Sequence, residues 1–243
     1  GVMQRTGLDR TSIVATTAAG IHGVPLAEFA LMGALYFVKD LPLLNTRKAQ
    51  HHWERYTTRE LRGLRALVVG LGAIGREVVR VFDAVGVQVT GLGRSGGRYD
   101  VAGLRRVIDR AELDSALPDV DILILSSPLT RETAGMIGAH QLGLLGKDAI
   151  VINVARGQLI DEDALIRALS TGALAGACLD VSVNEPLPGD SPFWDLENVI
   201  VSPHSASTVR TENRDLVELF LENMGHWRNG EAMRNLYDPV AGY

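Results

Sequence analysis

Three side chains in the second half of the chain have the types needed to move a proton at a polar substrate. Arg156, Glu185 and His204 follow, in that order, the last three of six short apolar segments. A histidine can pass a proton near neutral pH, and a neighbouring carboxylate can hold it in one tautomer and favour its charged form. An arginine can bind a carboxylate and polarise a carbonyl. A single histidine at a strand end is more often structural, so the hypothesis needs a fold that brings all three together.

The six apolar segments predict such a fold. Each has few charges and many β-branched residues, which is typical of strands buried on both faces of a parallel sheet. They span residues 66–70, 87–91, 121–127, 149–155, 175–181 and 198–204. Segments of helical periodicity separate them, and this alternation predicts a doubly wound α/β sheet with strand order 3-2-1-4-5-6. Because ligands bind beyond the carboxyl ends of such strands, the three polar side chains should meet in one cleft.

The first apolar segment runs directly into Gly-Leu-Gly-Ala-Ile-Gly, residues 70–75, and then into a helical pattern. Three glycines at this spacing are a weak signal alone, but a strand before and a helix after match the dinucleotide-binding fingerprint. Gly70 permits a tight turn, Gly72 lets a pyrophosphate approach the backbone, and Gly75 lets helix and strand pack closely. The helix N-terminus then offers N–H groups and a positive dipole to the phosphates. The alternative is a glycine-rich turn without a ligand.

The end of the second segment bears on which dinucleotide binds. NAD-binding proteins carry an acidic residue about 20 residues past the glycines, where it binds the ribose 2′-hydroxyl. Here that position is Gly93, followed by Arg94 and Ser95, with Arg98 nearby. Without the carboxylate a 2′-phosphate is not repelled, and a guanidinium can bind it through two hydrogen bonds. This favours NADP(H) and leaves NAD(H) open; the alternative is an exposed arginine in a loop without a ligand.

Composition argues against several classes of protein. The chain has 243 residues, of which 46% are hydrophobic, and a formal net charge of −5. This mild acidic excess argues against nucleic acid and membrane surfaces as partners. The most apolar stretch, residues 24–38, contains Glu28 and is too short to span a bilayer. Cys178 is the only cysteine, so no internal disulfide can form, and we expect a reducing, cytoplasmic location.

The two ends of the chain do not follow the strand–helix alternation. Residues 12–18 are a strand candidate, residues 24–50 predict one long helix or a pair broken at Pro42, and residues 206–228 predict another helix. The helix over residues 26–38 is apolar on nearly all sides and therefore needs burial on all sides. These pieces indicate a second, smaller unit and a connecting arm.

Together, these motifs resemble the D-isomer-specific 2-hydroxyacid dehydrogenases over nearly the whole chain. The matching segments, whose order and spacing are specific, are GVPLAEF (23–29), GLGAIG (70–75), SPLTRET (127–133), INVARG (152–157), DEDAL (161–165), LDV…EPLP (179–188), SPFW (191–194) and SPHSA (202–206). The resemblance implies a Rossmann-type dinucleotide-binding domain over residues 26–208, with an N-terminal dimerisation arm. It also implies that residues 1–25 and 209–243 are the remnant of a smaller, flavodoxin-like substrate domain.

The resemblance further implies hydride transfer between NAD(P)H and a small 2-oxo acid or D-2-hydroxy acid. Residues 93–95 (GRS), with EPLP and SPFW, are most similar to the glyoxylate/hydroxypyruvate reductase branch, which generally prefers NADPH. The implied catalytic set has Arg156 binding the substrate carboxylate, His204 protonating the keto oxygen, and Glu185 tuning and orienting His204. Further implied cofactor contacts are Ala73, Ile74, Pro128, Thr133, Val154, Ala155, Asp180 and His204. A homodimer is implied as well, in which the helical arm wraps the partner's nucleotide domain.

One departure from the family concerns the substrate domain. Family members have a substrate-binding loop in that domain that often reads Gly-Val, and here Gly1 and Val2 start the chain. By this resemblance Gly1 and Val2 would contact the substrate. We also expect that roughly the first half of the substrate domain is absent from this sequence.

Three alternatives stay open at this point. A formate dehydrogenase has the same wider fold, but it pairs its histidine with a glutamine, and formate has no keto oxygen to protonate. A dinucleotide-sensing corepressor keeps the same three residues, and turnover of glyoxylate or hydroxypyruvate would distinguish it. A catalytically inactive, truncated domain would bind cofactor without turnover. We expect no metal site, because His51 and His52 are adjacent positions of a helix that do not face each other.

Overall fold

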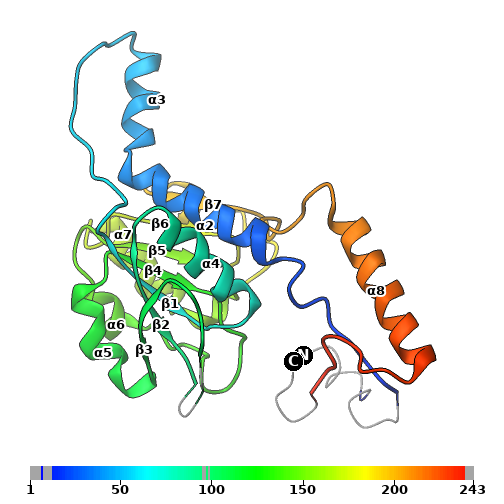
Figure 1. Cartoon of the computed structure of the whole chain (residues 1–243). Coiled ribbons are helices and arrows are strands. Elements are labelled where there is room, and N and C mark those ends of the chain that lie inside the picture. Colours follow the sequence, from blue (N-terminus) through cyan, green and yellow to red (C-terminus); the bar gives the residue numbers. More distant parts are fainter. Residues whose placement is uncertain (1–6, 8–12, 95–96, 98, 239–243) are drawn as a thin grey trace. The chain divides into compact units, whose positions relative to one another are not determined.

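The computed structural model describes residues 7, 13–94, 97 and 99–238 (Figure 1). It divides the chain into two compact units, Gly23–Ser207 and a smaller one made of Gly1–His22 with Thr208–Tyr243. The expected substrate contacts Gly1 and Val2 and the expected cofactor contact Ser95 lie outside the described residues.

The larger unit has the predicted doubly wound α/β fold. Within the described residues, its sheet has seven parallel strands in the order β3-β2-β1-β4-β5-β6-β7. The strands are β1 (Arg65–Val69), β2 (Gln88–Leu92), β3 (Leu104–Ile108), β4 (Ile122–Leu125), β5 (Ile150–Asn153), β6 (Gly176–Leu179) and β7 (Val199–Val201). The α-helices are α2 (Gly23–Val38), α3 (Leu41–Ala49), α4 (Ala73–Ala84), α5 (Leu113–Ala116), α6 (Ala139–Leu144) and α7 (Glu162–Ser170). Short 3₁₀ helices span Arg110–Glu112, Leu117–Asp119, Gly157–Leu159 and Pro192–Trp194.

The strand count and strand order predicted from the sequence are wrong at one edge of the sheet. Strand β3 was not among the six apolar segments, because its sequence LRRVI is largely exposed and contains two arginines. An edge strand needs no continuous apolar run, so the pattern that identifies buried strands does not find it. The predicted order would put the segment 121–127 at the edge beside the segment 87–91. That segment instead forms β4, which pairs with β1, and β3 takes the edge position.

Side-chain alternation along the central strands divides the core between the two faces of the sheet. Val68, Ile124 and other residues that share their face pack with α2 and α4. Val69 and Leu125, one position further along the same strands, pack with α6 and α7 on the opposite face. Helix α2 runs alongside α4 (Figure 1). The strands are therefore buried on both faces, which is why their sequences are apolar throughout.

Helix α2 lies directly on the sheet at a glycine. A Cβ on Gly33 would lie 2.6 Å from Sγ of Cys178 in β6, so a larger residue would push the helix away. Cys178 is buried, and this burial, together with the charge of Asp180, raises the pKa of its thiol to about 12. The thiol is therefore a core group and has no nucleophilic character near neutral pH.

The break between α2 and α3 lies before Pro42, not at it. Asp40 has a left-handed φ of 52°, and its side chain accepts a hydrogen bond from the Leu43 N–H at 3.3 Å. Asp40 is thus the N-cap of α3, and Pro42 lies in the first turn of that helix. Proline is tolerated there because the N–H groups of a first turn have no helical partner.

The smaller unit contains α8 (Glu212–Asn229), which begins six residues later than position 206, where the sequence predicts a helix. The prediction of a strand over residues 12–18 is wrong for the described part of this range, where Thr16 forms a single antiparallel bridge with Leu236. The N–H of Thr17 donates to the carbonyl of Asn235 at 2.8 Å, so segments from both ends of the chain pair with each other. That this unit belongs to a substrate domain stays a prediction.

Two kinds of feature are absent from the part of the chain that the structure describes. No group of three or more His, Cys, Asp or Glu side chains is placed to hold a metal ion. No helix there combines the length and the apolar character that a membrane crossing needs. His51 and His52 follow α3, and His52 pairs with Glu54 at 3.1 Å.

Candidate active site

The glycine-rich segment forms the turn between β1 and α4, and close contacts require two of its three glycines. Gly70 has a left-handed φ of 97°, and a Cβ there would lie 2.7 Å from the backbone of Ser127. A Cβ on Gly75 would lie 1.9 Å from the carbonyl oxygen of Gly70. The Ser126 hydroxyl donates to that same oxygen at 2.9 Å. These contacts fix the turn against the end of β4.

Gly72 has a different environment from the other two glycines. A Cβ added to Gly72 would meet no atom of the described chain within 4 Å. Gly72 is the N-cap of α4 and has no side chain to bind the N–H groups of the first turn, where Ala73 and Ile74 lie. A helix N-terminus next to open, unobstructed backbone is suited to bind phosphate. The turn therefore fits the pyrophosphate of a dinucleotide.

At the end of β2, an aromatic ring fills the space where NAD-binding proteins carry an acidic side chain. A Cβ on Gly93 would lie 2.3 Å from the ring of Tyr99. The Tyr99 hydroxyl accepts a hydrogen bond from the Arg94 N–H at 2.7 Å, and the Arg94 residue is exposed. A side chain at position 93 would therefore require the Tyr99 ring to move.

The segment after β4 closes on itself through a threonine. The hydroxyl of Thr133 donates to the carbonyl of Pro128 at 2.7 Å and accepts from the N–H of Thr130 at 2.8 Å. Pro128 and Thr133, both expected to contact the cofactor, thus belong to one turn. This turn follows β4, which pairs with β1 in parallel. It therefore lies at the carboxyl ends of the strands, as the glycine-rich turn does.

Asn153, which was not among the predicted site residues, shapes the turn that carries Arg156. Its side chain is buried, its amide donates to the carbonyl of Arg156 at 3.0 Å, and its oxygen accepts from the Ala155 N–H at 3.0 Å. Val154 and Ala155 are buried in this turn, whereas Arg156 is exposed. The sequence signal for Asn153 is a polar residue at the end of an otherwise apolar strand.

A buried carboxylate holds the loop that follows β7. Oδ1 of Asp180 accepts hydrogen bonds from the Ser202 hydroxyl at 2.6 Å and from the N–H groups of Ser205 at 2.9 Å and Ala206 at 3.0 Å. The Asp180 carbonyl also accepts from the His204 N–H at 2.9 Å. These bonds hold His204 at a left-handed φ of 54°, which is unfavourable for most residues with a side chain. A contact of Asp180 with the cofactor stays a prediction.

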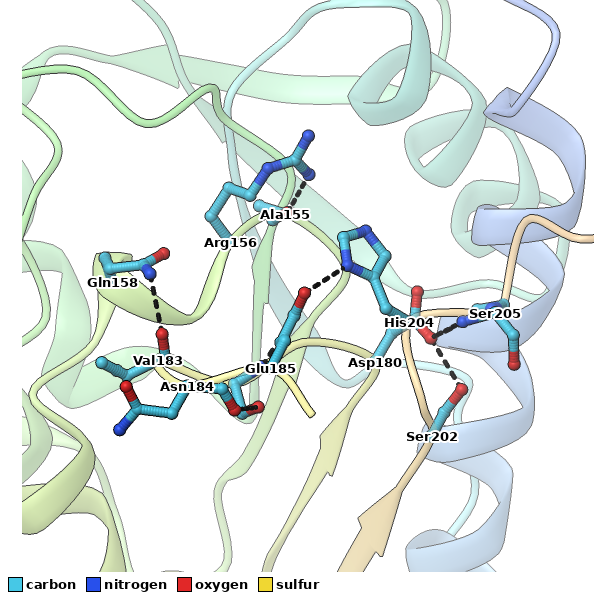
Figure 2. Close-up of polar contacts among 12 residues, drawn as sticks. Ala155, Arg156, Gln158, Asp180, Val183, Asn184, Glu185, Ser202, His204 and Ser205 are labelled. Atoms are coloured by element: carbon cyan, nitrogen blue, oxygen red, sulfur yellow. Dashed lines mark hydrogen bonds and ion pairs between the residues drawn. The ribbon is translucent and has the colours of Figure 1, made fainter. Parts of the chain in front are cut away.

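Glu185 and His204 form a hydrogen-bonded pair (Figure 2). Nδ1 of His204 lies 2.8 Å from Oε2 of Glu185, whose Oε1 accepts from the Ser182 N–H at 3.2 Å. Because an ionised carboxylate can only accept, Nδ1 carries the proton and Nε2 is left for another partner. The two side chains are 41% and 39% exposed, so a ligand can reach the pair.

Arg156 is the third residue of the predicted set. Figure 2 shows the side chains of Arg156 and His204 extending to the same side of the loop that carries Glu185. Nη1 of Arg156 donates to the carbonyl of Ala155 at 2.5 Å. An arginine beside a histidine whose Nε2 is available can bind an anionic group and exchange a proton with it.

Comparison with known proteins identifies the larger unit. Residues 31–206 match the family model described as D-isomer specific 2-hydroxyacid dehydrogenase, NAD binding domain. The chain belongs to this family. The resemblance seen in its motifs is thereby confirmed.

Two curated relatives within the dehydrogenase family have longer chains. The D-3-phosphoglycerate dehydrogenase of Archaeoglobus fulgidus is 32% identical over 227 residues, which is 92% of this chain and 42% of that protein. The glyoxylate/hydroxypyruvate reductase B of Pectobacterium carotovorum is 37% identical over 172 residues, or 71% of this chain and 53% of that protein. This chain therefore spans about half the length of the curated relatives it matches.

A solved structure from the same family has the same fold. The D-isomer specific 2-hydroxyacid dehydrogenase of Xanthobacter autotrophicus Py2, in complex with NADPH and MES, superposes with a TM-score of 0.86. The two sequences are 32% identical, and the similarity covers 98% of each chain.

At two glycines of the glycine-rich turn, we expect the same substitution to have different effects, one on stability and the other on cofactor binding. Gly75→Ala should lower the free energy of unfolding by roughly 1–3 kcal/mol or more, because its methyl group would collide with the Gly70 carbonyl. Gly72→Ala should change stability by less than about 0.5 kcal/mol. It should nevertheless weaken dinucleotide binding, because its methyl group takes the space the pyrophosphate needs. Thermal denaturation and fluorescence titration with NADPH measure both effects; an equally unstable Gly72→Ala would mean that Gly72 is structural only.

Proposed function

We propose that this protein transfers a hydride between NAD(P)H and a small 2-oxo acid or D-2-hydroxy acid. The observation that carries the proposal is the hydrogen bond between His204 and Glu185 beside Arg156, because it joins an acid–base group to an anion-binding group. The open backbone at Gly72 supports a dinucleotide at the same edge of the sheet. Membership of the dehydrogenase family supports the reaction class.

The nicotinamide, when bound, supplies the hydride that reaches the carbonyl carbon. Arg156 would bind the substrate carboxylate with its planar guanidinium and stabilise the charge that develops on the carbonyl oxygen. Protonated His204 would give the proton on Nε2 to that oxygen and keep the proton on Nδ1 bonded to Glu185. In the oxidation direction, neutral His204 would accept the hydroxyl proton at Nε2. Glu185 would act by orienting the ring.

The substrate type we propose is glyoxylate or hydroxypyruvate. The segments GRS, EPLP and SPFW and the relative named glyoxylate/hydroxypyruvate reductase B support it. The test follows the loss of NADPH or NADH absorbance with glyoxylate, hydroxypyruvate, pyruvate and 3-phosphohydroxypyruvate. Fastest turnover of either of the first two would support the proposal. NADPH binding without turnover of any 2-oxo acid would contradict it and favour a dinucleotide sensor or an inactive domain.

NADPH should bind more tightly than NADH, because the position that is acidic in NAD-binding proteins is Gly93 here, and Arg94 follows it. Arg94→Ala should weaken NADPH binding about tenfold or more, the size of one charge-assisted contact to the 2′-phosphate. NADH lacks this phosphate, so its dissociation constant should hardly change. Fluorescence titration with both cofactors measures the difference. Arg105→Ala, which removes the same charge from exposed strand β3, is the matched control.

The assignment of Arg94 depends on the difference between the two cofactors. If Arg94→Ala weakened NADPH and NADH equally, the arginine would not bind the 2′-phosphate. If Arg105→Ala had the same effect as Arg94→Ala, the loss would reflect the general charge of this edge of the sheet.

We propose that the protein is a homodimer held by α2, α3 and the segment that follows α3. Met32 in α2, Leu44 in α3 and Trp53 after α3 are apolar and exposed by 42%, 44% and 99%, which favours burial against a second copy. Sedimentation at micromolar concentration should show a dimer. The double change Met32→Glu with Leu44→Glu should shift it to a monomer, whereas Val107→Glu on β3 should not. A strictly monomeric parent protein would refute the prediction.

A further inference from the structure

Two side chains from the segment after Arg156 bind the loop that carries Glu185. The N–H of Val183 donates to Oε2 of Glu162 at 2.9 Å, and the carbonyl of Val183 accepts from Nε2 of Gln158 at 3.0 Å. Gln158 lies in the 3₁₀ helix that follows Arg156, and Glu162 is the first residue of α7. Both backbone polar groups of Val183 are thus bound by side chains and not by a neighbouring strand.

The same two segments also touch through their backbones. A Cβ on Gly157 would lie 2.0 Å from the carbonyl carbon of Ser182 and 2.3 Å from the nitrogen of Val183. Glycine is therefore the residue that lets the turn at 182–183 approach so closely. A close-packed contact of this kind makes the position of one segment depend on the position of the other.

The next contact leads from this turn to the acid–base pair. The N–H of Ser182 donates to Oε1 of Glu185 at 3.2 Å, and Oε2 of Glu185 binds Nδ1 of His204 at 2.8 Å. Two consecutive N–H groups of one turn therefore bind two carboxylates, that of Glu185 and that of Glu162. If the turn rotated, the Ser182 N–H would point elsewhere and the Glu185 carboxylate would lose one of its two fixed partners.

We infer that Glu162 and Gln158 are positioning residues for His204. They fix the turn at 182–183, the turn directs the carboxylate of Glu185, and that carboxylate orients the imidazole. The inference rests on the proposed function, because it assigns a role within the same site. It requires an acceptor at position 162 for the Val183 N–H and a donor at position 158 for the Val183 carbonyl.

Substitutions at positions 158 and 162 test the need for a donor and an acceptor. Gln158→Glu places a carboxylate against the Val183 carbonyl, and Glu162→Ala removes the acceptor; each should lower kcat roughly fivefold or more, the scale of a lost hydrogen bond. Glu162→Gln keeps an accepting oxygen and should restore most of kcat. The NADPH dissociation constant and the thermal midpoint should stay near the parent values. Asp163→Ala, which removes an adjacent exposed carboxylate of α7, is the control and should leave kcat unchanged.

A double-mutant cycle tests whether the effect passes through Glu185. In a Glu185→Ala background, Gln158→Glu should cause no further loss of kcat, because the residue through which it acts is gone. Independent, multiplying losses would overturn the inference. So would a Glu162→Gln variant as slow as Glu162→Ala.

A second readout separates this inference from the proposed function. If the parent protein reduced no 2-oxo acid, the proposed function would fail, but the Nδ1 proton of His204 could still be followed by NMR without substrate. Its resonance should be present in the parent and in Asp163→Ala, and shifted or lost in Gln158→Glu and Glu162→Ala. An unchanged resonance in both of the latter variants would overturn the inference.

Discussion

Replacing His204 with alanine should lower kcat for 2-oxo acid reduction by about 10² or more, the usual size of a general-acid contribution. Glu185 occupies Nδ1 of the ring, so Nε2 is the group left to deliver the proton, and alanine offers no replacement. Cofactor affinity should change much less, because the glycine-rich turn that we expect to bind the pyrophosphate lies between β1 and α4 and not on the loop after β7. Steady-state kinetics and NADPH titration measure the two effects.

The backbone at position 204 decides which control variant is needed. His204 has a left-handed φ of 54°, a conformation that asparagine tolerates better than alanine does. His204→Asn should therefore keep the loop and still lose the proton donor, and its kcat should be as low as that of His204→Ala. Thermal denaturation shows whether alanine also destabilises the loop. A variant that reduced glyoxylate at the parent rate would show that this histidine is structural and that the mechanism is wrong.

The central part of the fold could be predicted because strands buried on both faces must be apolar along their whole length. This reasoning fails at β3, where Arg105 and Arg106 are exposed at the sheet edge and leave no apolar run. Missing that strand then misplaces the segment 121–127 in the strand order. The expected helix break at Pro42 fails for another reason: sequence alone does not show whether a proline interrupts a helix or begins one.

Within the candidate site, sequence could predict that Glu185 and His204 lie together, but not what holds the loops that carry the site residues. Arg156 and His204 follow parallel strands, and the carboxyl ends of such strands share one edge. The buried side chains of Asn153 and Asp180 bind the backbone of the turns that carry these two residues. A buried polar side chain can bind a loop or a ligand, and only its position in space distinguishes the two. Sequence also could not predict that the ring of Tyr99 lies against Gly93, because this contact depends on how the loop after β2 folds back.

Arg156→Lys should lower kcat/KM for 2-oxo acids by roughly 10- to 100-fold, although it keeps the positive charge. Arginine presents a planar fork that binds both oxygens of a carboxylate, whereas lysine presents one flexible ammonium group. Position 156 is set by the Asn153 bond to its carbonyl, so the backbone should not move to compensate for a side chain of different shape. Steady-state kinetics with glyoxylate or hydroxypyruvate measure the loss. Arg167→Lys, at an exposed position of α7, is the matched control and should behave as the parent.

A substrate without the carboxylate separates anion binding from other roles of Arg156. The parent should reduce the methyl ester of a 2-oxo acid much more slowly than the free acid, because the ester cannot form the bidentate ion pair. On the ester, the parent and Arg156→Lys should differ far less than they do on the acid, because the lost interaction is absent from both. If Arg156→Lys lost the same factor on acid and ester, the arginine would act on the carbonyl oxygen alone. Recognition of the carboxylate would then have to come from other residues.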